Sequence, residues 1–380
     1  MTAELILTNA IIVTAAEAFP GSVVVRDGIV AAVDRGASAA PGSVDLAGDY
    51  LLPGLVELHT DNLEKHVAPR PGVRWPMRGA VLAHDAQIAA SGITTVFDAL
   101  TVCEVRDNPV RADMLHDAAN VMGEAQAAGL LRAEHFLHMR CEVAHEAVVE
   151  VVEPFLDNPL TRLVSLMDHT PGQRQFATIE KYCEYYQGKF GYSDAEMAEL
   201  IQRRAAEQGR FADRHRRAIA AMCRERHLPT ASHDDATIGH VDEAVGFGLT
   251  IAEFPTTQEA AAAAHAGGMA VVMGAPNVVR GGSHSGNVSA STLAAAGLLD
   301  ILSSDYVPFS LLHAAFLLHR ELDMKLTEVV AKISLNPARI VGLDDRGEIA
   351  AGQRADLVRV ATAGDMPVVR QTWRAGRRII

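Results

Sequence analysis

Cysteine, aromatic side chains and long apolar runs are all scarce in this sequence. Among its 380 residues, four are cysteines and 5% are aromatic. The cysteines form no Cys-x-x-Cys pair, which argues against a disulfide framework or a zinc ribbon and is typical of reduced intracellular thiols. No window offers the ~20 consecutive apolar residues of a membrane-spanning helix. The first residues also lack the basic segment of a signal peptide. We therefore expect a cytoplasmic protein without a membrane segment.

Positive charge is also in deficit. The chain has 34 lysines and arginines against 47 aspartates and glutamates, which gives a formal net charge of −13. An acidic surface disfavours broad contact with nucleic acid or an anionic membrane, so we expect neither as a partner. The net charge does not exclude an anionic small molecule, because a local basic pocket can oppose the global field.

Apolar residues, by contrast, are plentiful enough for a large core. Hydrophobic residues make up 49% of the chain and charged residues 21%, the balance of a globular protein. Short runs rich in β-branched residues occupy both ends of the chain, at residues 5–13, 21–25, 29–33, 355–360 and 368–372. Two β-rich ends around a different middle predict one small β-sandwich domain, composed of residues 1–50 and 345–380.

Between these ends, eight apolar runs alternate with helix-length segments. The runs are residues 55–61, 93–100, 135–142, 163–169, 228–234, 251–254, 270–275 and 301–305. Eight strands with helical connectors predict an α/β fold, a (β/α)8 TIM-like barrel over residues 51–344. An open doubly wound sheet is the alternative, but it rarely carries so many polar residues at strand ends. The connector at 172–225 is too long for one link and indicates either a helical lid or a solvated helical excursion.

Nearly every run ends in an ionisable residue, at the edge where a barrel enzyme places its chemistry. His59 and Asp61 lie two apart on the first run, so both side chains point to one side and together could grip a divalent ion. His169 and His233 end two later runs, and Glu142 ends a run that precedes both. An incidental polar pair is the alternative for His59 and Asp61 taken alone.

Asp305 ends the eighth run and completes the predicted set of metal ligands. Histidines and carboxylates together suit zinc first, with manganese or iron as alternatives, at one or two centres that Glu142 is placed to bridge. Asp305 is also the predicted catalytic residue, because a carboxylate beside a metal can orient a water molecule and take its proton. Any of these residues could instead be a hydrogen-bonded buried group, and Asp168, Glu253 and His284 are reserve ligands.

Basic residues cluster around the same strand ends. The candidates for substrate binding are Lys65, Arg140, Arg174, Arg280 and His284. The last two lie in the glycine-rich run 277–287, whose backbone N–H groups and guanidinium suit a phosphate, although a flexible connector is the alternative. A basic patch within an acidic protein predicts a small phosphorylated substrate.

Two sets of motifs resemble known families. The run 52–59, the triplet Asn336-Pro337-Ala338 and residues 355–358 resemble motifs of the amidohydrolase superfamily. More narrowly, the PhnM family of phosphonate-metabolism proteins is similar over residues 59–66, 165–176, 231–237, 252–257 and 273–287. This resemblance implies a metal-dependent diphosphatase that converts α-D-ribose 1-methylphosphonate 5-triphosphate to the 5-phosphate and diphosphate. It also implies a place in the carbon–phosphorus lyase pathway of alkylphosphonate degradation.

The candidate site departs from the superfamily pattern in two places. The usual His-x-His is His-x-Asp here, with Asp61 second, and the carbamylated bridging lysine has no equivalent, so we expect Glu142 to replace it. Two other functions stay open. One is a hydrolase of the same architecture that acts on an amide, a lactam or a ring amine, and the other is a non-catalytic subunit of a complex. A homo-oligomer is compatible with the apolar segment 311–318, although core packing suits that segment better.

Overall fold

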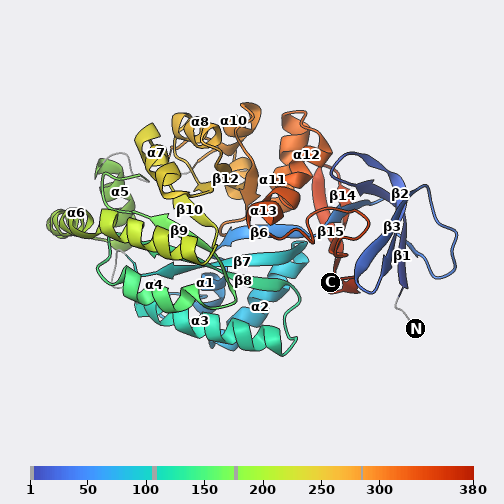
Figure 1. Ribbon diagram of the computed structural model, residues 1–380, viewed down its shortest axis with the longest axis horizontal. Coiled ribbons are helices and arrows are strands. Elements are labelled where there is room, and N and C mark those ends of the chain that lie inside the picture. The colour runs from blue at the N-terminus through green and yellow to red at the C-terminus, as the bar shows by residue number, and fades with distance from the viewer. Residues whose placement is uncertain (1–3, 105–108, 175–178, 284–285) are drawn as a thin grey trace.

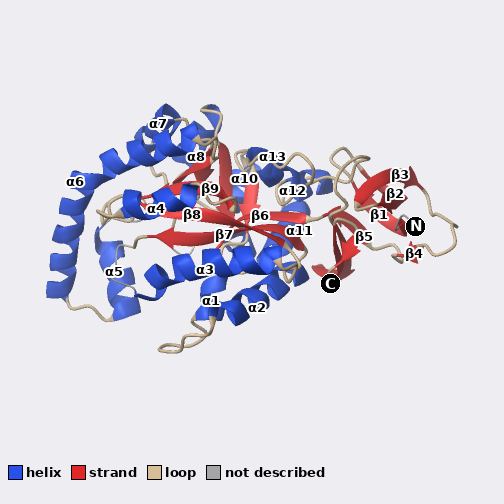
Figure 2. Ribbon diagram, turned by 60° about the horizontal axis from the view of Figure 1, so that its bottom comes forward, coloured by secondary structure: helices blue, strands red, loops and turns tan. Residues whose placement is uncertain are grey.

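The computed structural model describes residues 4–104, 109–174, 179–283 and 286–380. It contains two sheets, each with eight strands, which lie side by side along the longest axis of the molecule (Figure 1). Helices surround the sheet formed by the middle of the chain, and both chain ends lie at the other sheet (Figure 2). This arrangement confirms the predicted (β/α)8 barrel with a small β-domain from the two termini. The strands of that domain form one connected sheet, where a β-sandwich was predicted.

The barrel sheet contains all eight predicted runs as strands, in sequence order and with every adjacent pair parallel. They are β6 (Leu55–Thr60), β7 (Ile93–Val102), β8 (Glu134–Glu142), β9 (Thr161–Met167), β10 (Thr230–His233), β11 (Ile251–Glu253), β12 (Ala270–Gly274) and β13 (Ile301–Ser303). A single bridge between Thr60 and Asp305 brings the last strand back to the first. The carboxyl ends of all eight strands therefore meet at one rim.

Thirteen helices are described around the barrel. They are α1 (Leu63–Val67), α2 (Met77–Ala90), α3 (Pro109–Ala127), α4 (Val148–Leu156), α5 (Ile179–Phe190), α6 (Asp194–Glu225), α7 (Ile238–Phe247), α8 (Gln258–Ala266), α9 (Ala275–Val279), α10 (Ala290–Ala295), α11 (Ser310–Glu321), α12 (Leu326–Ala331) and α13 (Leu335–Ile340). Thr237 and Thr257 cap α7 and α8 by accepting backbone N–H bonds, which sets where each helix begins. In the described chain, none of these helices has both the length and the apolarity needed to cross a membrane.

Two apolar layers hold the barrel together. One fills its interior, where Val56, Phe97 and Val272 belong to a single buried cluster. The other lies between the strands and the helices and is the largest apolar cluster among the described residues. The apolar segment 311–318 belongs to α11, where Leu311 and Leu318 are buried in this outer layer. Core packing therefore explains that segment.

The terminal sheet joins the two ends of the chain. Its strands are β1 (Glu4–Val13), β2 (Ala18–Arg26), β3 (Ile29–Arg35), β4 (Val44–Asp45), β5 (Tyr50–Pro53), β14 (Leu357–Ala363), β15 (Met366–Arg374) and β16 (Arg377–Arg378). The junction is β5, which pairs parallel with β1 and antiparallel with β14. A second apolar core, which includes Leu7, Ile12 and Trp373, stabilises this sheet. Because β5 extends to Pro53, the sheet continues slightly past residue 50.

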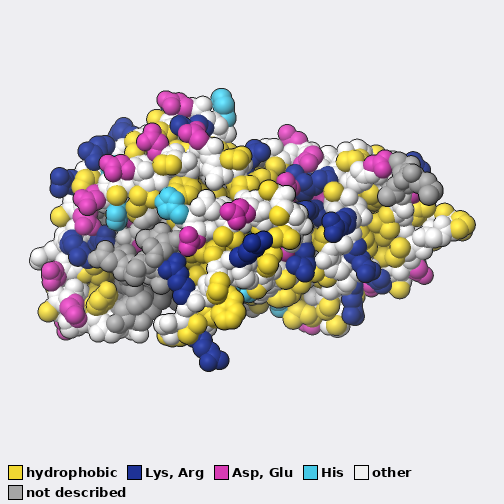
Figure 3. Space-filling model, turned by 90° about the horizontal axis from the view of Figure 1, so that it is seen from below, with side chains coloured by type: hydrophobic (Ala, Val, Ile, Leu, Met, Phe, Trp, Pro, Cys, Tyr) yellow, Lys and Arg dark blue, Asp and Glu magenta, His cyan; other side chains and the backbone are white. Residues whose placement is uncertain are grey.

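The long connector after β9 contains two helices, α5 and α6, which lie at the end of the barrel away from the terminal sheet (Figure 2). A capping box between Ser193 and Glu196 starts α6, whose length of 32 residues carries it along the barrel beside α4. Ile219 and Cys223 are buried there, and His215 contacts the carbonyl oxygen of Val143 at 3.1 Å. The second half of α6 is therefore packed against the barrel. On the face shown in Figure 3, acidic and basic side chains are interspersed among apolar ones.

Candidate active site

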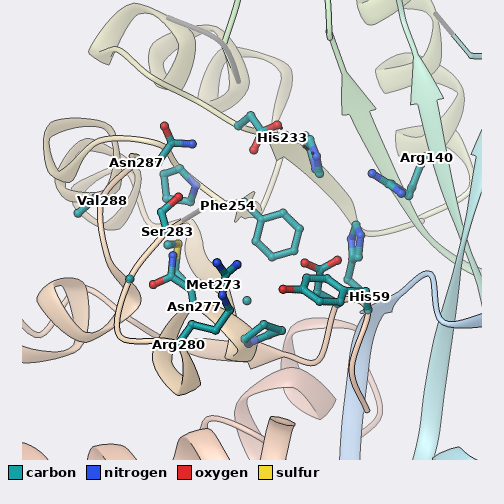
Figure 4. A pocket seen from close by; sticks show the side chains of 17 residues that line it. His59, Arg140, His233, Phe254, Met273, Asn277, Arg280, Ser283, Asn287 and Val288 are labelled. Carbon is teal, nitrogen blue, oxygen red and sulfur yellow. Dashed lines mark ion pairs between the residues drawn. The ribbon is translucent and has the colours of Figure 1, made fainter. Parts of the chain in front are cut away.

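A cavity of about 170 Å³ opens at the carboxyl rim of the barrel. Its walls come from the ends of β6, β8, β10 and β13 and from the segment around α9 (Figure 4). The lining includes His59, Arg140, His233, Asp234, Phe254, Asn277, Arg280, Asn287, Asp305 and Tyr306. Residues predicted from five separate places in the sequence thus meet in one hollow.

Glu253 connects the two histidines on either side of the cavity floor. Its Oε1 lies 2.6 Å from Nδ1 of His59, and its Oε2 lies 2.7 Å from Nδ1 of His233. The carboxylate is 2% exposed, and burial alone would raise its pKa. The adjacent rings of His59 and His138, and the hydrogen bonds from His233 and His59, instead hold that pKa well below its usual value. One ionised carboxylate therefore orients both rings.

Glu142 does the same for His169. Its Oε2 lies 2.8 Å from Nδ1 of His169, and its Oε1 accepts the backbone N–H of that residue at 3.1 Å. In all three histidines a carboxylate holds Nδ1, so Nε2 is the ring nitrogen available to a ligand. Carboxylate, histidine and metal in that order form a common arrangement in metalloenzymes, because the carboxylate sets the ring's tautomer and orientation.

Asp234 lies between two of these rings. Its backbone has φ of +57°, a left-handed conformation that turns the chain immediately after β10. Its Oδ2 lies 3.5 Å from Nε2 of His233 and 3.8 Å from Nε2 of His169. That oxygen is buried and has no hydrogen-bond partner among the described residues. A buried acceptor without a donor costs free energy, so a cation between the three residues would resolve the deficit.

Asp305 follows β13 and also has a left-handed backbone, with φ of +53°. Its N–H donates to the carbonyl oxygen of His59 at 3.1 Å, and its own carbonyl oxygen accepts from the hydroxyl of Thr60 at 2.7 Å. Burial and the neighbouring charge of Asp61 raise its pKa to about 7, whereas Arg140 and His233 act in the opposite direction. A carboxyl group with a pKa near neutrality can both take up and release a proton under physiological conditions.

Positive charge reaches the cavity from two sides. Arg140 extends from β8, and its Nε is buried without a hydrogen-bond partner among the described residues. Arg280 caps the end of α9 and lies across the cavity from Arg140 (Figure 4). Gly281 and Gly282 follow it with φ of +77° and +154°, so the backbone there adopts conformations that a side chain would disfavour. This segment can therefore approach a phosphate closely.

Other predicted residues lie outside the cavity wall. Arg174 is buried, where its guanidinium pairs with Asp235 and with Glu243, the latter at 2.9 Å. Lys65 is exposed at the rim, with Nζ 5.1 Å from the ring centre of Tyr306. Asp61 follows β6 and affects the site through the charge that it places near Asp305.

Two reserve ligands have different outcomes. Asp168 is 3.2 Å from a guanidinium nitrogen of Arg216 and serves as its ion-pair partner. His284 lies outside the described residues.

Sequence reasoning missed two residues of the site, Asp234 and His138. His138 is buried beside His59, with ring centres 5.1 Å apart, and burial lowers its pKa to about 3. It lies on β8 with Arg140 and Glu142, and this spacing of two places all three on one face of the strand. That alternation was the available signal. For Asp234 the signal was its place as the last residue of the predicted run 228–234.

Among the residues that the structure describes, three groups of side chains have the composition of a metal site. They are His169 with His233 and Asp234, His59 with His138 and Glu253, and His84 with Asp98 and His135. The first fits an ion best because His233 and Asp234 line the cavity and because an Asp234 oxygen has no hydrogen-bond partner among the described residues. In the second, both ring nitrogens of His138 are occupied, by the Leu58 carbonyl oxygen at 3.0 Å and by the Ser165 hydroxyl at 2.9 Å.

The chain matches one protein family over most of its length. Residues 76–380 match the model of the amidohydrolase family. Over 377 residues the chain is 48% identical to the alpha-D-ribose 1-methylphosphonate 5-triphosphate diphosphatase of Escherichia coli (strain K12), covering 99% of this chain and all of that protein.

Two solved structures show the same fold at low identity. An N-acetyl-D-glucosamine-6-phosphate deacetylase mutant from Mycobacterium smegmatis is 17% identical and superposes with a TM-score of 0.66 over the whole of both chains. Molinate hydrolase is 12% identical, with a TM-score of 0.67 over 99% of this chain and 94% of that one. With the family match and the relative in Escherichia coli, these findings show that the chain belongs to the amidohydrolase family.

Proposed function

We propose that this chain hydrolyses α-D-ribose 1-methylphosphonate 5-triphosphate to the 5-phosphate and diphosphate, as a step in alkylphosphonate degradation by the carbon–phosphorus lyase pathway. The observation that carries the proposal is 48% identity to the Escherichia coli diphosphatase along the full length of both proteins. The cavity supports it, because Arg140 and Arg280 give it positive charge in a protein whose net charge is −13. The reduced thiols expected of Cys103, Cys141, Cys183 and Cys223 favour the cytoplasm as its location.

The proposed cofactor is a divalent transition metal, with zinc as the first candidate and one or two ions per chain. His59, His169 and His233 would bind through Nε2, and the buried Oδ2 of Asp234 would join them. Asp305, Asp61 and Glu142 stay in the proposed ligand set. An ion in this place would act as a Lewis acid that withdraws charge from phosphoryl oxygens.

Arg140 and Arg280 would bind the polyphosphate from opposite sides. A guanidinium can donate two parallel hydrogen bonds to a pair of phosphate oxygens, which stabilises charge that develops there during the reaction. The main-chain N–H groups around Gly282 can add further donors, since this glycine lines the cavity. These contacts would bring the anhydride bond next to Asp305.

Asp305 would orient the attacking water molecule and take its proton. The water oxygen forms a bond to phosphorus while the anhydride P–O bond breaks, and diphosphate leaves with the electron pair of that bond. The proton passes to the Asp305 carboxylate, so atoms and charge balance. His233 and Arg140 support the ionised form of Asp305 before the reaction, because both lower its pKa.

Product analysis by phosphorus NMR tests this function. The purified, metal-loaded protein should convert the triphosphate to equal amounts of 5-phosphate and diphosphate. Release of orthophosphate, or turnover only of an amide, a lactam or a ring amine, would overturn the proposal. A protein that binds metal and turns over none of these substrates would point to a non-catalytic subunit.

A further inference from the structure

The first and last strands of the barrel do not pair directly along most of the seam where the barrel closes. The N–H of Val56 in β6 donates to the carbonyl oxygen of Ile333, and the N–H of Leu302 in β13 donates to that of Lys332, each at 3.0 Å. Residues 332–333 thus separate the lower parts of the two strands. Above them, the bridge between Thr60 and Asp305 joins the strands at the rim. Between residues 332–333 and that bridge, another contact must fix the distance between β6 and β13.

Glu57 is the side chain that crosses this seam. It is fully buried, its Oε1 accepts the N–H of His59 at 2.7 Å, and its Oε2 accepts the N–H of Ser304 at 2.5 Å. One carboxyl group therefore holds the main chain of β6 and the residue after β13. Both contacts are made next to the points where His59 and Asp305 turn toward the cavity.

We propose that Glu57 is a positioning residue of the active site, whose carboxyl group sets the spacing between His59 and Asp305. It reaches neither the cavity nor the substrate and acts only through these two residues. Its kinetic consequence rests on the proposed function, whereas its structural consequence does not.

The chemistry of the seam requires a side chain with two acceptor oxygens. Between Glu57 and Thr60, β6 contains one more residue than the paired stretch of β7, so the regular ladder is interrupted there. The N–H groups of His59 and Ser304 would be buried without acceptors if Glu57 were absent, which proteins strongly avoid. A glutamine at this position offers one acceptor oxygen, and its amide nitrogen would oppose the second N–H group.

Two further hydrogen bonds join β6 to the end of β13 at the same level of the seam. The hydroxyl of Ser303 donates to the carbonyl oxygen of His59 at 3.0 Å, and the N–H of Asp305 donates to that same oxygen at 3.1 Å. His59 is therefore fixed to the eighth strand through both its N–H, by way of Glu57, and its carbonyl oxygen. A shift of Glu57 would move His59 relative to Asp305.

Asp85 provides a matched control. It is also fully buried and also accepts two main-chain N–H groups, those of Arg132 and Ala133, each at 2.9 Å. It lies on α2 and holds the segment before β8, away from the cavity lining. Its Oδ1 accepts both N–H groups, so Asp85→Asn replaces a buried carboxylate that anchors main chain without touching the seam.

The experiment compares Glu57→Gln and Asp85→Asn in the metal-loaded protein. Glu57→Gln should lower kcat by about 10- to 100-fold with little change in KM, since a misplacement of about 1 Å can cost that much. Amide hydrogen exchange should become faster in peptides covering His59 and Ser304. Asp85→Asn should lower the Tm and leave kcat unchanged. Unaltered kcat and exchange in Glu57→Gln, or an equal loss of kcat in both variants, would overturn the assignment.

Two further measurements keep the test decisive. If wild-type protein does not turn over the triphosphate, the exchange comparison alone still judges the role of Glu57, so the two proposals fail separately. If Glu57→Gln does not fold, Ser303→Ala weakens the same seam more gently. It should lower kcat and speed exchange at His59, and wild-type behaviour in both measurements would contradict the proposal.

Discussion

Two clusters of histidine and carboxylate differ sharply in this molecule although their composition is the same. The cavity cluster contains His169, His233 and Asp234, at the carboxyl rim of the barrel. The wall cluster contains His84, Asp98 and His135, between α2 and the outer side of the barrel strands, and all three are 0% exposed. From residue type alone, either cluster could be taken for a metal site.

In the wall cluster, every ring nitrogen and carboxylate oxygen already has a partner. Asp98 accepts from His84 and His135, at 2.7 Å in each case, while Nε2 of His135 lies 3.3 Å from Asp85. Burial alone would lower the pKa of His135, but the carboxylates of Asp98 and Asp85 raise it to about 9. Both ring nitrogens of His135 therefore carry protons that they donate, and neither has a lone pair for a metal.

In the cavity cluster, the carboxylates occupy only one nitrogen of each ring, and Asp234 keeps an unpartnered oxygen. This difference indicates that a metal site is identified by acceptor atoms that have no hydrogen-bond donor and lie beside a cavity. The wall cluster is a closed ion-pair network that fastens α2 to the barrel.

Metal removal should have the largest effect. Chelation should abolish turnover, and added zinc should restore it, because the ion would withdraw charge from the phosphoryl oxygens. His233→Ala should lose both the metal and the activity, whereas His84→Gln should retain both. Metal content by elemental analysis beside the activity assay measures this contrast. Full activity in rigorously metal-free protein would refute the assignment of the cavity cluster.

Asp305→Asn should have the second-largest effect on turnover. We expect kcat to fall by about 100-fold or more, because the amide cannot accept the proton of the attacking water. Metal content should fall less than in His233→Ala. Steady-state kinetics with elemental analysis would check both statements, and a kcat near that of the wild type would remove Asp305 from the catalytic step.

The arginines of the cavity should have a smaller effect. Arg140→Lys and Arg280→Lys should each lower kcat/KM for the triphosphate by about 10- to 100-fold, because an ammonium cannot pair two oxygens as a guanidinium does. The loss should be smaller for a substrate with one phosphate. Arg174→Lys is the control: its guanidinium pairs with Asp235 and Glu243, so we expect the same change for both substrates. A phosphate-dependent loss in Arg174→Lys would support the prediction made from sequence.

Replacement of His135 should lower the stability of the fold and leave turnover unchanged. Its pKa is about 9 in the folded chain against 6.5 for an unperturbed histidine, so its stabilising contribution is complete below pH 6.5 and is lost as the pH rises to about 9. His135→Gln should lower the free energy of unfolding by about 3 kcal/mol near neutral pH, since it breaks a buried ion pair. Denaturant unfolding between pH 6 and 9 measures the effect. An unfolding free energy equally pH-dependent in wild type and variant would place the titration elsewhere.

The sequence anticipated the architecture because each barrel strand is an apolar run with a polar end. His59, His233 and Asp305 were found in this way, Arg140 beside such an end and Arg280 in the glycine-rich run 277–287. All five line the cavity. Arg174 also follows a strand end, yet the turn after β9 directs its guanidinium into a buried ion pair. Sequence spacing predicts that a residue lies on the rim, but it does not predict which other side chain that residue pairs with.

Glu57 shows the other limit. Its role depends on a departure from regular geometry, an extra residue in β6, which no periodic pattern reveals. The wall cluster has a similar cause, because His84 and His135 are 51 positions apart in the sequence and meet only through packing of α2 on β7 and β8.

An anomalous difference map at the zinc absorption edge, from crystals of the zinc-loaded protein, tests the central claim most directly. The account predicts a peak at Nε2 of His169 and His233 and beside Oδ2 of Asp234, and none among His84, Asp98 and His135. A peak in the wall cluster, or an empty cavity in crystals of active protein, would contradict it.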